Sequence, residues 1–176
     1  QFIREKHSNS ELLGIFIKIG DAIAYSHSRR VLHLDLKPEN IQVGSFGEVI
    51  VCDWGLGRIV TTQEENSGTS DMELDADILN HCTLYGEAKG TPGYMAPEQL
   101  LGQDKTERTD IYALGALLFS LLIPQRLKGK STEEILNETR QGKATPTQQK
   151  QELSASLKAV ICKAMAHDPK QRYASV

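Results

Sequence analysis

The sequence lacks the features of secreted, membrane-spanning and nucleic-acid-binding proteins. It has three cysteines, Cys52, Cys82 and Cys162, an odd number without metal-ligand spacing, which favours a reducing cytoplasm over a disulfide framework. The longest apolar run, from Ile111 to Ile123, is too short to cross a bilayer. The formal net charge is −3, so nothing indicates a nucleic-acid or anionic membrane partner. We expect one cytoplasmic domain over the 176 residues.

One short stretch, from His33 to Asn40, sets an Asp, a Lys and an Asn at fixed offsets with little apolar bulk between them. Burying three such side chains without partners costs on the order of several kcal/mol, so the stretch suits neither a core strand nor a core helix. Phosphoryl transfer needs a carboxylate to orient the attacking hydroxyl, a cation for the phosphate and an oxygen ligand for Mg²⁺. Asp35, Lys37 and Asn40 would supply these groups.

Apolar periodicity and capping signals predict a mainly α-helical chain with a small β-hairpin. A capping box at Ser8 precedes a predicted helix from about Asn9 to Arg29. Two β-branched runs, Ile41–Val43 and Val49–Cys52, flank a Gly-containing turn and predict the hairpin. Further helices are predicted from Glu107 to Pro124, from Ser131 to about Arg140, and after Ser154. The apolar faces of the first and last helices are Leu12, Leu13, Phe16, Ile19 and Ile23, and Leu157, Val160, Ile161 and Met165.

The hairpin leads into Asp53, which follows an apolar strand and precedes two closely spaced glycines. This pattern puts a hard oxygen ligand where the backbone can turn sharply. A simpler alternative is that Asp53 only caps a turn. The short separation from Asp35 and Asn40 favours a ligand.

These motifs resemble those of eukaryotic-type Ser/Thr protein kinases. Residues 33–40, His-Leu-Asp-Leu-Lys-Pro-Glu-Asn, resemble the catalytic loop H-R-D-L-x-x-x-N, with Leu34 in place of the usual Arg. Asp53-Trp54-Gly55 resembles D-F-G, and residues 90–98 resemble the end of an activation segment that finishes in A-P-E. The activation segment would then run from 53 to 98.

Two later stretches extend the resemblance. Residues 107–115 are similar to the central helix of the family, whose Asp110 is expected to bond the catalytic-loop backbone. From the residues alone, Asp110 could also be a plain helix N-cap. Residues 166–173 resemble the signature whose Arg pairs with the Glu of A-P-E, so we predict an ion pair between Glu98 and Arg172.

The resemblance implies a role for each site residue. Asp35 would position the substrate hydroxyl, and Lys37 would neutralise charge on the γ-phosphate of ATP. Asn40 and Asp53 would bind Mg²⁺. Thr91 would bond Asp35 and Lys37 and shape the platform for a protein Ser or Thr. The residues expected to be structural are His33, Glu98, Asp110 and Arg172.

The resemblance maps onto one lobe of the family fold. The sequence contains no G-x-G-x-x-G loop and no V-A-I-K strand with an ATP-binding Lys, and it opens on Gln1 without an initiator Met. We therefore expect residues 1–176 to be the C-terminal lobe of the protein-kinase-like α+β fold, cut from a longer protein and lacking the N-lobe. The fragment alone would be inactive, with ATP bound at most weakly.

The activation segment is long and rich in Thr, Ser, Asn, Asp and Glu. The side chains in it that could carry a phosphate are Thr61, Thr62, Ser67, Thr69, Ser70 and Thr83; a solvated acidic loop without a regulated site is an equal alternative. Leu34 cannot pair with a phosphate as Arg would. We expect the parent protein to depend less on phosphorylation there than kinases with Arg at that position.

Two other functions remain open at this point. A pseudokinase or scaffold would keep the fold for protein binding without phosphoryl transfer, although Asp35, Asn40 and Asp53 are intact. A small-molecule phosphotransferase shares the His-x-Asp loop. It should lack residues 90–98 and the Arg172 signature.

Overall fold

The computed structural model describes residues 7–60, 91–146 and 153–176. The predicted phosphorylation sites between 61 and 83 lie outside these ranges. The elements in chain order are α1 (Asn9–Ser28), β1 (Val31–Leu32), the 3-10 helix η2 (Pro38–Asn40), β2 (Ile41–Val43), β3 (Val49–Val51), β4 (Arg58–Ile59), α3 (Pro97–Leu100), α4 (Glu107–Leu122), η4 (Pro124–Leu127), α5 (Thr132–Arg140), α6 (Ala155–Ala164) and η6 (Pro169–Gln171).

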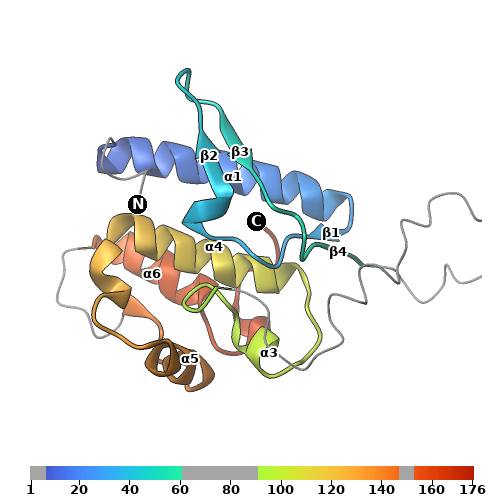
Figure 1. Ribbon diagram of the computed structural model, residues 1–176, viewed down its shortest axis with the longest axis vertical. Coiled ribbons are helices and arrows are strands. Elements are labelled where there is room, and N and C mark those ends of the chain that lie inside the picture. Colours follow the sequence, from blue (N-terminus) through green and yellow to red (C-terminus); the bar gives the residue numbers. More distant parts are fainter. Residues whose placement is uncertain (1–6, 61–90, 147–152) are drawn as a thin grey trace, which may run out of the picture.

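Helix α4 lies at the centre and is apolar on all sides, as a helix enclosed by others must be. It packs against α1 on one side and α6 on another (Figure 1). One core cluster joins the α1-facing side of α4, including Leu117, to Ile19 and Ile23 of α1. A second cluster joins the other side, including Tyr112, to Ile161 and neighbouring residues of α6. The catalytic-loop region therefore lies over a rigid, fully packed helix.

The helix termini follow the capping signals of the sequence. The Ser8 hydroxyl accepts from the Glu11 N–H, while the Glu11 carboxylate accepts from the Ser8 N–H, so the predicted capping box is confirmed. Helix α1 ends at Ser28, one residue before the predicted end. Helix α4 ends at Leu122, two residues before Pro124, which begins η4. One core prediction is wrong: Val160 is 40% exposed, because α6 turns that side away from α4.

Two small antiparallel sheets accompany the helices. Strands β2 and β3 pair with Ile41 opposite Val51, which confirms the predicted hairpin, and its tip projects beyond α1 (Figure 1). Strands β1 and β4 also pair, with Val31 opposite Ile59. That pair was not predicted, because two-residue strands show no periodicity. The mainly helical class with a small hairpin is confirmed.

Two helix glycines should respond in opposite directions to replacement by Ala. Gly115 in α4 faces α6, and a Cβ there would lie 2.7 Å from the Ala164 Cβ, whereas nothing lies within 4 Å of a Cβ at Gly14. We expect Gly14→Ala to stabilise by about 0.5–1 kcal/mol through helix propensity. Gly115→Ala should destabilise by about 1–3 kcal/mol, because overpacking outweighs propensity. Denaturant unfolding of both variants measures this, and a stabilised Gly115→Ala would contradict the close packing of α4 and α6.

Candidate active site

Asp35, Lys37 and Asn40 are brought together by the loop that connects β1 to η2. The Lys37 Nζ donates to the Asp35 Oδ2 at 2.7 Å. The Asn40 amide nitrogen donates to the Asp35 backbone oxygen at 2.9 Å and to its Oδ2 at 3.3 Å. The three groups that the sequence singled out therefore form one hydrogen-bonded cluster.

The direction of these bonds decides which atoms remain available for chemistry. Both side-chain donors use the Asp35 Oδ2, and no described residue bonds Oδ1, so Oδ1 is the carboxylate oxygen that we expect to accept from an incoming hydroxyl. The Asn40 amide donates through its nitrogen, and no described residue bonds its Oδ1, which could therefore bind a cation. The cluster thus presents a proton acceptor, a cation and an oxygen ligand.

Asp53 lies beside this cluster but makes no contact with it in the described part of the chain. The Cys52 N–H donates to the Asn40 oxygen at 2.8 Å, which continues the β2–β3 register and holds Asp53 near Asn40. Asp53 is exposed, and its backbone has a φ of 60°. Its Oδ1 accepts from the Gly55 N–H at 3.4 Å, so it also stabilises a turn.

The described residues hold no group of three or more His, Cys, Asp or Glu side chains suited to a metal. One Asp and one Asn oxygen are too few to hold Mg²⁺, which needs six oxygen ligands. These residues fit Mg²⁺ only if nucleotide phosphates and water complete its coordination, as in phosphoryl-transfer sites.

His33 is fully buried and forms hydrogen bonds both to Cys52, next to Asp53, and to Asp35. Its Nε2–H donates to the Cys52 oxygen at 3.1 Å, and its Nδ1 accepts from the Asp35 N–H at 3.3 Å. Because a carbonyl can only accept and an amide N–H can only donate, these bonds require the neutral Nε2–H tautomer. Burial lowers the pKa of His33 below 6.5, partly offset by the bond to Cys52. Trp54 packs on its ring, with centroids 4.5 Å apart.

Asp110 anchors the same loop from the first turn of α4. Its side chain is fully buried, and it accepts from the backbone N–H groups of His33 and Leu34, each at 2.8 Å. Its Oδ2 also contacts His27 Nε2 at 2.9 Å. The alternative that Asp110 is a plain N-cap is wrong, because Thr106 caps α4.

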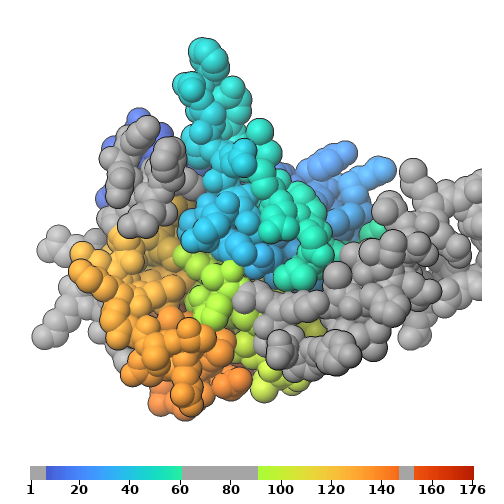
Figure 2. All heavy atoms as spheres, in the orientation of Figure 1, coloured from blue at the N-terminus to red at the C-terminus, as the bar shows by residue number. Residues whose placement is uncertain are grey.

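Thr91 lies near Asp35, although the two are not bonded. Both line a small recess together with Leu34, Leu36, Tyr94 and Met95. No hydrogen bond joins Thr91 to Asp35 or Lys37 among the described residues, so the expected bonds of its hydroxyl are not formed in this structure. In Figure 2, the green residues from 91 onward lie between the blue loop above and the orange segment after α4 below.

Glu98 and Arg172 form the predicted ion pair. Two parallel hydrogen bonds of 2.6 and 2.8 Å join the guanidinium to the carboxylate, and both side chains are buried. Arg172 also donates to the backbone oxygens of Ala166 and Arg108, and it lies over the Tyr112 ring at 4.9 Å. The pair fixes α3, and with it the segment that begins at Thr91, to the C-terminal part of the chain.

Sequence reasoning missed two positioning side chains. Gln99 donates to the Leu34 oxygen at 2.9 Å and accepts from the Ala96 N–H at 2.9 Å, which links α3 to the catalytic loop. His27, in the last turn of α1, contacts Asp110. Neither stands in a motif with chemical meaning, and their partners are far away in the sequence. The only available signal was their position next to the motifs they support.

Comparison with known proteins agrees with the site. A family model described as "Protein kinase domain" matches residues 2–175. Serine/threonine-protein kinase PknD of Chlamydia felis is 39% identical over 175 residues, and PknD of Chlamydia pneumoniae is 39% identical over 181 residues. PknD of Chlamydia muridarum is 38% identical over 186 residues. Each alignment covers 99% of this chain and 19% of the relative.

The chain therefore belongs to the protein kinase domain family. These relatives are all named Ser/Thr kinases, and the chain spans about a fifth of their length. In the described ranges, no helix is long and apolar enough to cross a membrane.

The Glu98–Arg172 pair should be worth far more than an exposed pair. Glu98→Gln leaves the Arg172 charge buried without its partner, and we expect a loss of about 3–5 kcal/mol of unfolding free energy. The matched control is Lys130→Met, which breaks the exposed Lys130–Glu138 pair and should cost about 1 kcal/mol or less. Denaturant unfolding compares the two. Equal losses would show that burial of the pair has no energetic consequence.

The catalytic loop should loosen in mild acid because His33 is held neutral. The unfolded loop takes up a proton as pH falls through 6.5, whereas the folded loop does so only at its lowered pKa. The stabilising contribution of neutral His33 is therefore complete above pH 6.5. It is lost as the pH falls from 6.5 toward the lowered pKa of the folded state. Hydrogen exchange of amides 33–36, corrected for intrinsic rates, should show less protection at about pH 5.5 than at about pH 7.5. His33→Gln should remove this difference; an unchanged difference would assign it to another group.

Proposed function

We propose that the protein is a Ser/Thr protein kinase, which transfers the γ-phosphoryl group of ATP to Ser or Thr hydroxyls of a protein substrate. The observation that carries the proposal is the Asp35 carboxylate, held on one oxygen by Lys37 and Asn40, while no described residue bonds the other oxygen. Asp35 lines a small recess together with Thr91. Membership of the protein kinase family and the names of the relatives support the same activity.

In the proposed reaction, Asp35 Oδ1 accepts the proton of the substrate hydroxyl as its oxygen attacks the γ-phosphorus. The bond from that phosphorus to the β–γ bridging oxygen breaks, and ADP leaves. Lys37 Nζ lies beside the carboxylate and stabilises the negative charge on the transferring group. Thr91 contributes one wall of the recess that receives the hydroxyl.

Asn40 and Asp53 are the proposed Mg²⁺ ligands, through the amide Oδ1 and the carboxylate. Mg²⁺ held by these two side chains would supply positive charge to neutralise the phosphates of ATP. The β2–β3 register supports this assignment, because it holds both residues next to each other at the end of the hairpin.

We propose that residues 1–176 are the C-terminal lobe of the kinase fold. The 176 residues contain no glycine-rich loop and no V-A-I-K strand to cover the nucleotide, so this segment alone should show no robust turnover. The proposed use of ATP suggests that the protein acts in the cytoplasm, where ATP is supplied. The free thiols of Cys52 and Cys162 support the same location.

The decisive experiment measures phosphoryl transfer by the full-length protein to a general protein acceptor such as casein or myelin basic protein, with Mg²⁺ and labelled ATP. Asp35→Asn should lower kcat by about 10²-fold or more, because the proton acceptor is lost. The matched control, exposed Asp104→Asn, should leave kcat unchanged.

Two outcomes would contradict the proposal. Wild-type rates in the Asp35→Asn variant would show that Asp35 is not the acceptor. A folded wild-type protein without any transfer, including autophosphorylation, would favour the pseudokinase.

A further inference from the structure

Arg126, in η4, is a buried cation outside the site described so far. It is only 4% exposed, and within the described ranges no carboxylate forms an ion pair with it. Its Nε donates to the Ser120 hydroxyl at 2.6 Å, and its Nη2 donates to the backbone oxygen of Gly93 at 2.5 Å. The guanidinium also lies over the rings of Tyr94 and Phe119, at 5.1 and 5.3 Å from their centroids.

These contacts compensate for the desolvation of the charge. Burial lowers the pKa of Arg126, while the neighbouring Tyr94 opposes that change. A guanidinium is suited to this position because its planar fork can donate in fixed directions while its faces lie on aromatic rings. Lys could keep the charge but not this geometry.

Two of the four partners of Arg126 belong to the segment that follows Thr91. Tyr94 lines the recess that contains Asp35, and Gly93 precedes it. Gly93 has a φ of +94°, and a Cβ there would lie 2.7 Å from Leu127 Cδ1. The backbone of this segment therefore lies close against η4, and Arg126 forms a polar link between the two.

We propose that Arg126 is a positioning residue that holds the wall of the phosphoacceptor recess, through the Gly93 carbonyl and the Tyr94 ring, in the form that binds a protein substrate. The inference rests on the proposed kinase function. Loss of Arg126 should weaken binding of the protein acceptor, while ATP binding and transfer to water, which need no acceptor wall, should persist.

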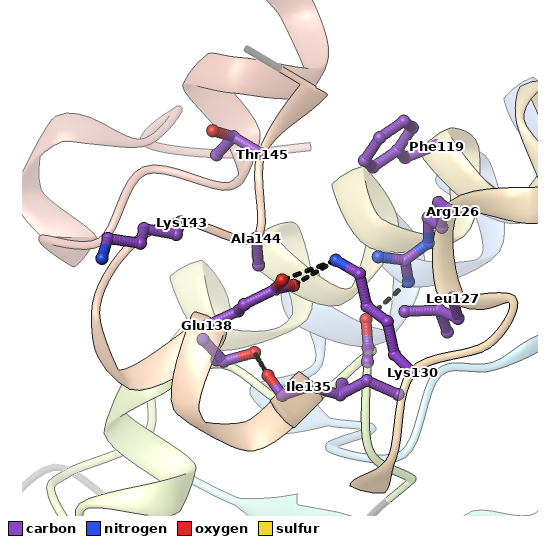
Figure 3. Close-up of a pocket in the computed structure, with 11 residues that line it drawn as sticks. Phe119, Arg126, Leu127, Lys130, Ile135, Glu138, Lys143, Ala144 and Thr145 are labelled. Atoms are coloured by element: carbon purple, nitrogen blue, oxygen red, sulfur yellow. Dashed lines mark hydrogen bonds and ion pairs between the residues drawn. The ribbon is translucent and has the colours of Figure 1, made fainter. Parts of the chain in front are cut away.

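The surroundings of Arg126 supply a matched control. Arg126 and Lys130 both line a cavity of about 60 Å³ between η4 and α5. Figure 3 shows that the Lys130 amine points to Glu138. The Arg126 guanidinium donates instead to the Gly93 backbone oxygen. Lys130→Met therefore removes a positive charge from the same cavity without touching Gly93 or Tyr94.

The test uses the full-length protein and measures KM for a protein acceptor, KM for ATP, and ATP hydrolysis without acceptor. In Arg126→Met we expect KM for the acceptor to rise about tenfold or more. KM for ATP and the hydrolysis rate should stay within about twofold. Arg126→Lys should show a similar split, and Lys130→Met should match the wild type in all three values. An acceptor KM within twofold of wild type in Arg126→Met would overturn the proposal. Equal impairment of the acceptor KM, the ATP KM and the hydrolysis rate in that variant would also overturn it.

If the Arg126 variants do not fold, Ser120→Ala tests the positioning role of Arg126 instead. It removes the acceptor of the Arg126 Nε, together with the bond from the Ser120 hydroxyl to the Ala116 oxygen within α4. It should raise the acceptor KM by about twofold to fivefold; no change would then overturn the proposal. Asp35→Asn separates this inference from the proposed function. If Asp35→Asn abolishes transfer and the Arg126 and Ser120 variants leave the acceptor KM unchanged, only the positioning role fails.

Discussion

The buried carboxylate of Asp110 is the interaction on which the candidate site depends. It accepts two backbone N–H groups of the catalytic loop and contacts His27 at the end of α1, so three segments meet at one side chain. A buried charge without such partners would cost several kcal/mol, on the order of the stability of a whole domain. Because the donors lie on consecutive residues, Asp110 sets the direction of the loop and thereby the orientation of Asp35.

Helix α4 connects Asp110 to the other residues of the site. Its N-terminal turn carries Asp110, its middle packs against α1 and α6, and its C-terminal end leads directly into η4 and Arg126. One end of the helix therefore holds the loop with Asp35, while the other leads to the residue that contacts Gly93 and Tyr94. The packed helix α4 therefore connects the loop that carries Asp35 to the segment that carries Tyr94.

The residues to which we assign chemical roles were predictable from the sequence because their spacing suits the proposed reaction. Of the residues that position them, Asp110 was predicted only through resemblance to a family, and Gln99 and His27 were missed. Asp35, Lys37 and Asn40 lie within one loop, so the sequence alone predicts that they meet. The Glu98–Arg172 pair was predicted only through resemblance to a family, since no local rule connects residues so far apart. Gln99 and Arg126 form contacts that depend on tertiary packing, and the pairing of β1 with β4 is too short for any periodicity.

Leu34 shows how the fold compensates for a missing cation. A bulky residue at a φ of 66° is strained by about 1–3 kcal/mol and persists only where its surroundings hold it. Here the Leu34 N–H donates to Asp110, and its carbonyl accepts from Gln99, so both backbone groups are fixed by buried parts of the structure. The conformation of the residue before Asp35 is thus held by these backbone bonds and not by a side-chain charge. This arrangement gives a physical reason to expect that the loop is formed without phosphorylation of the activation segment.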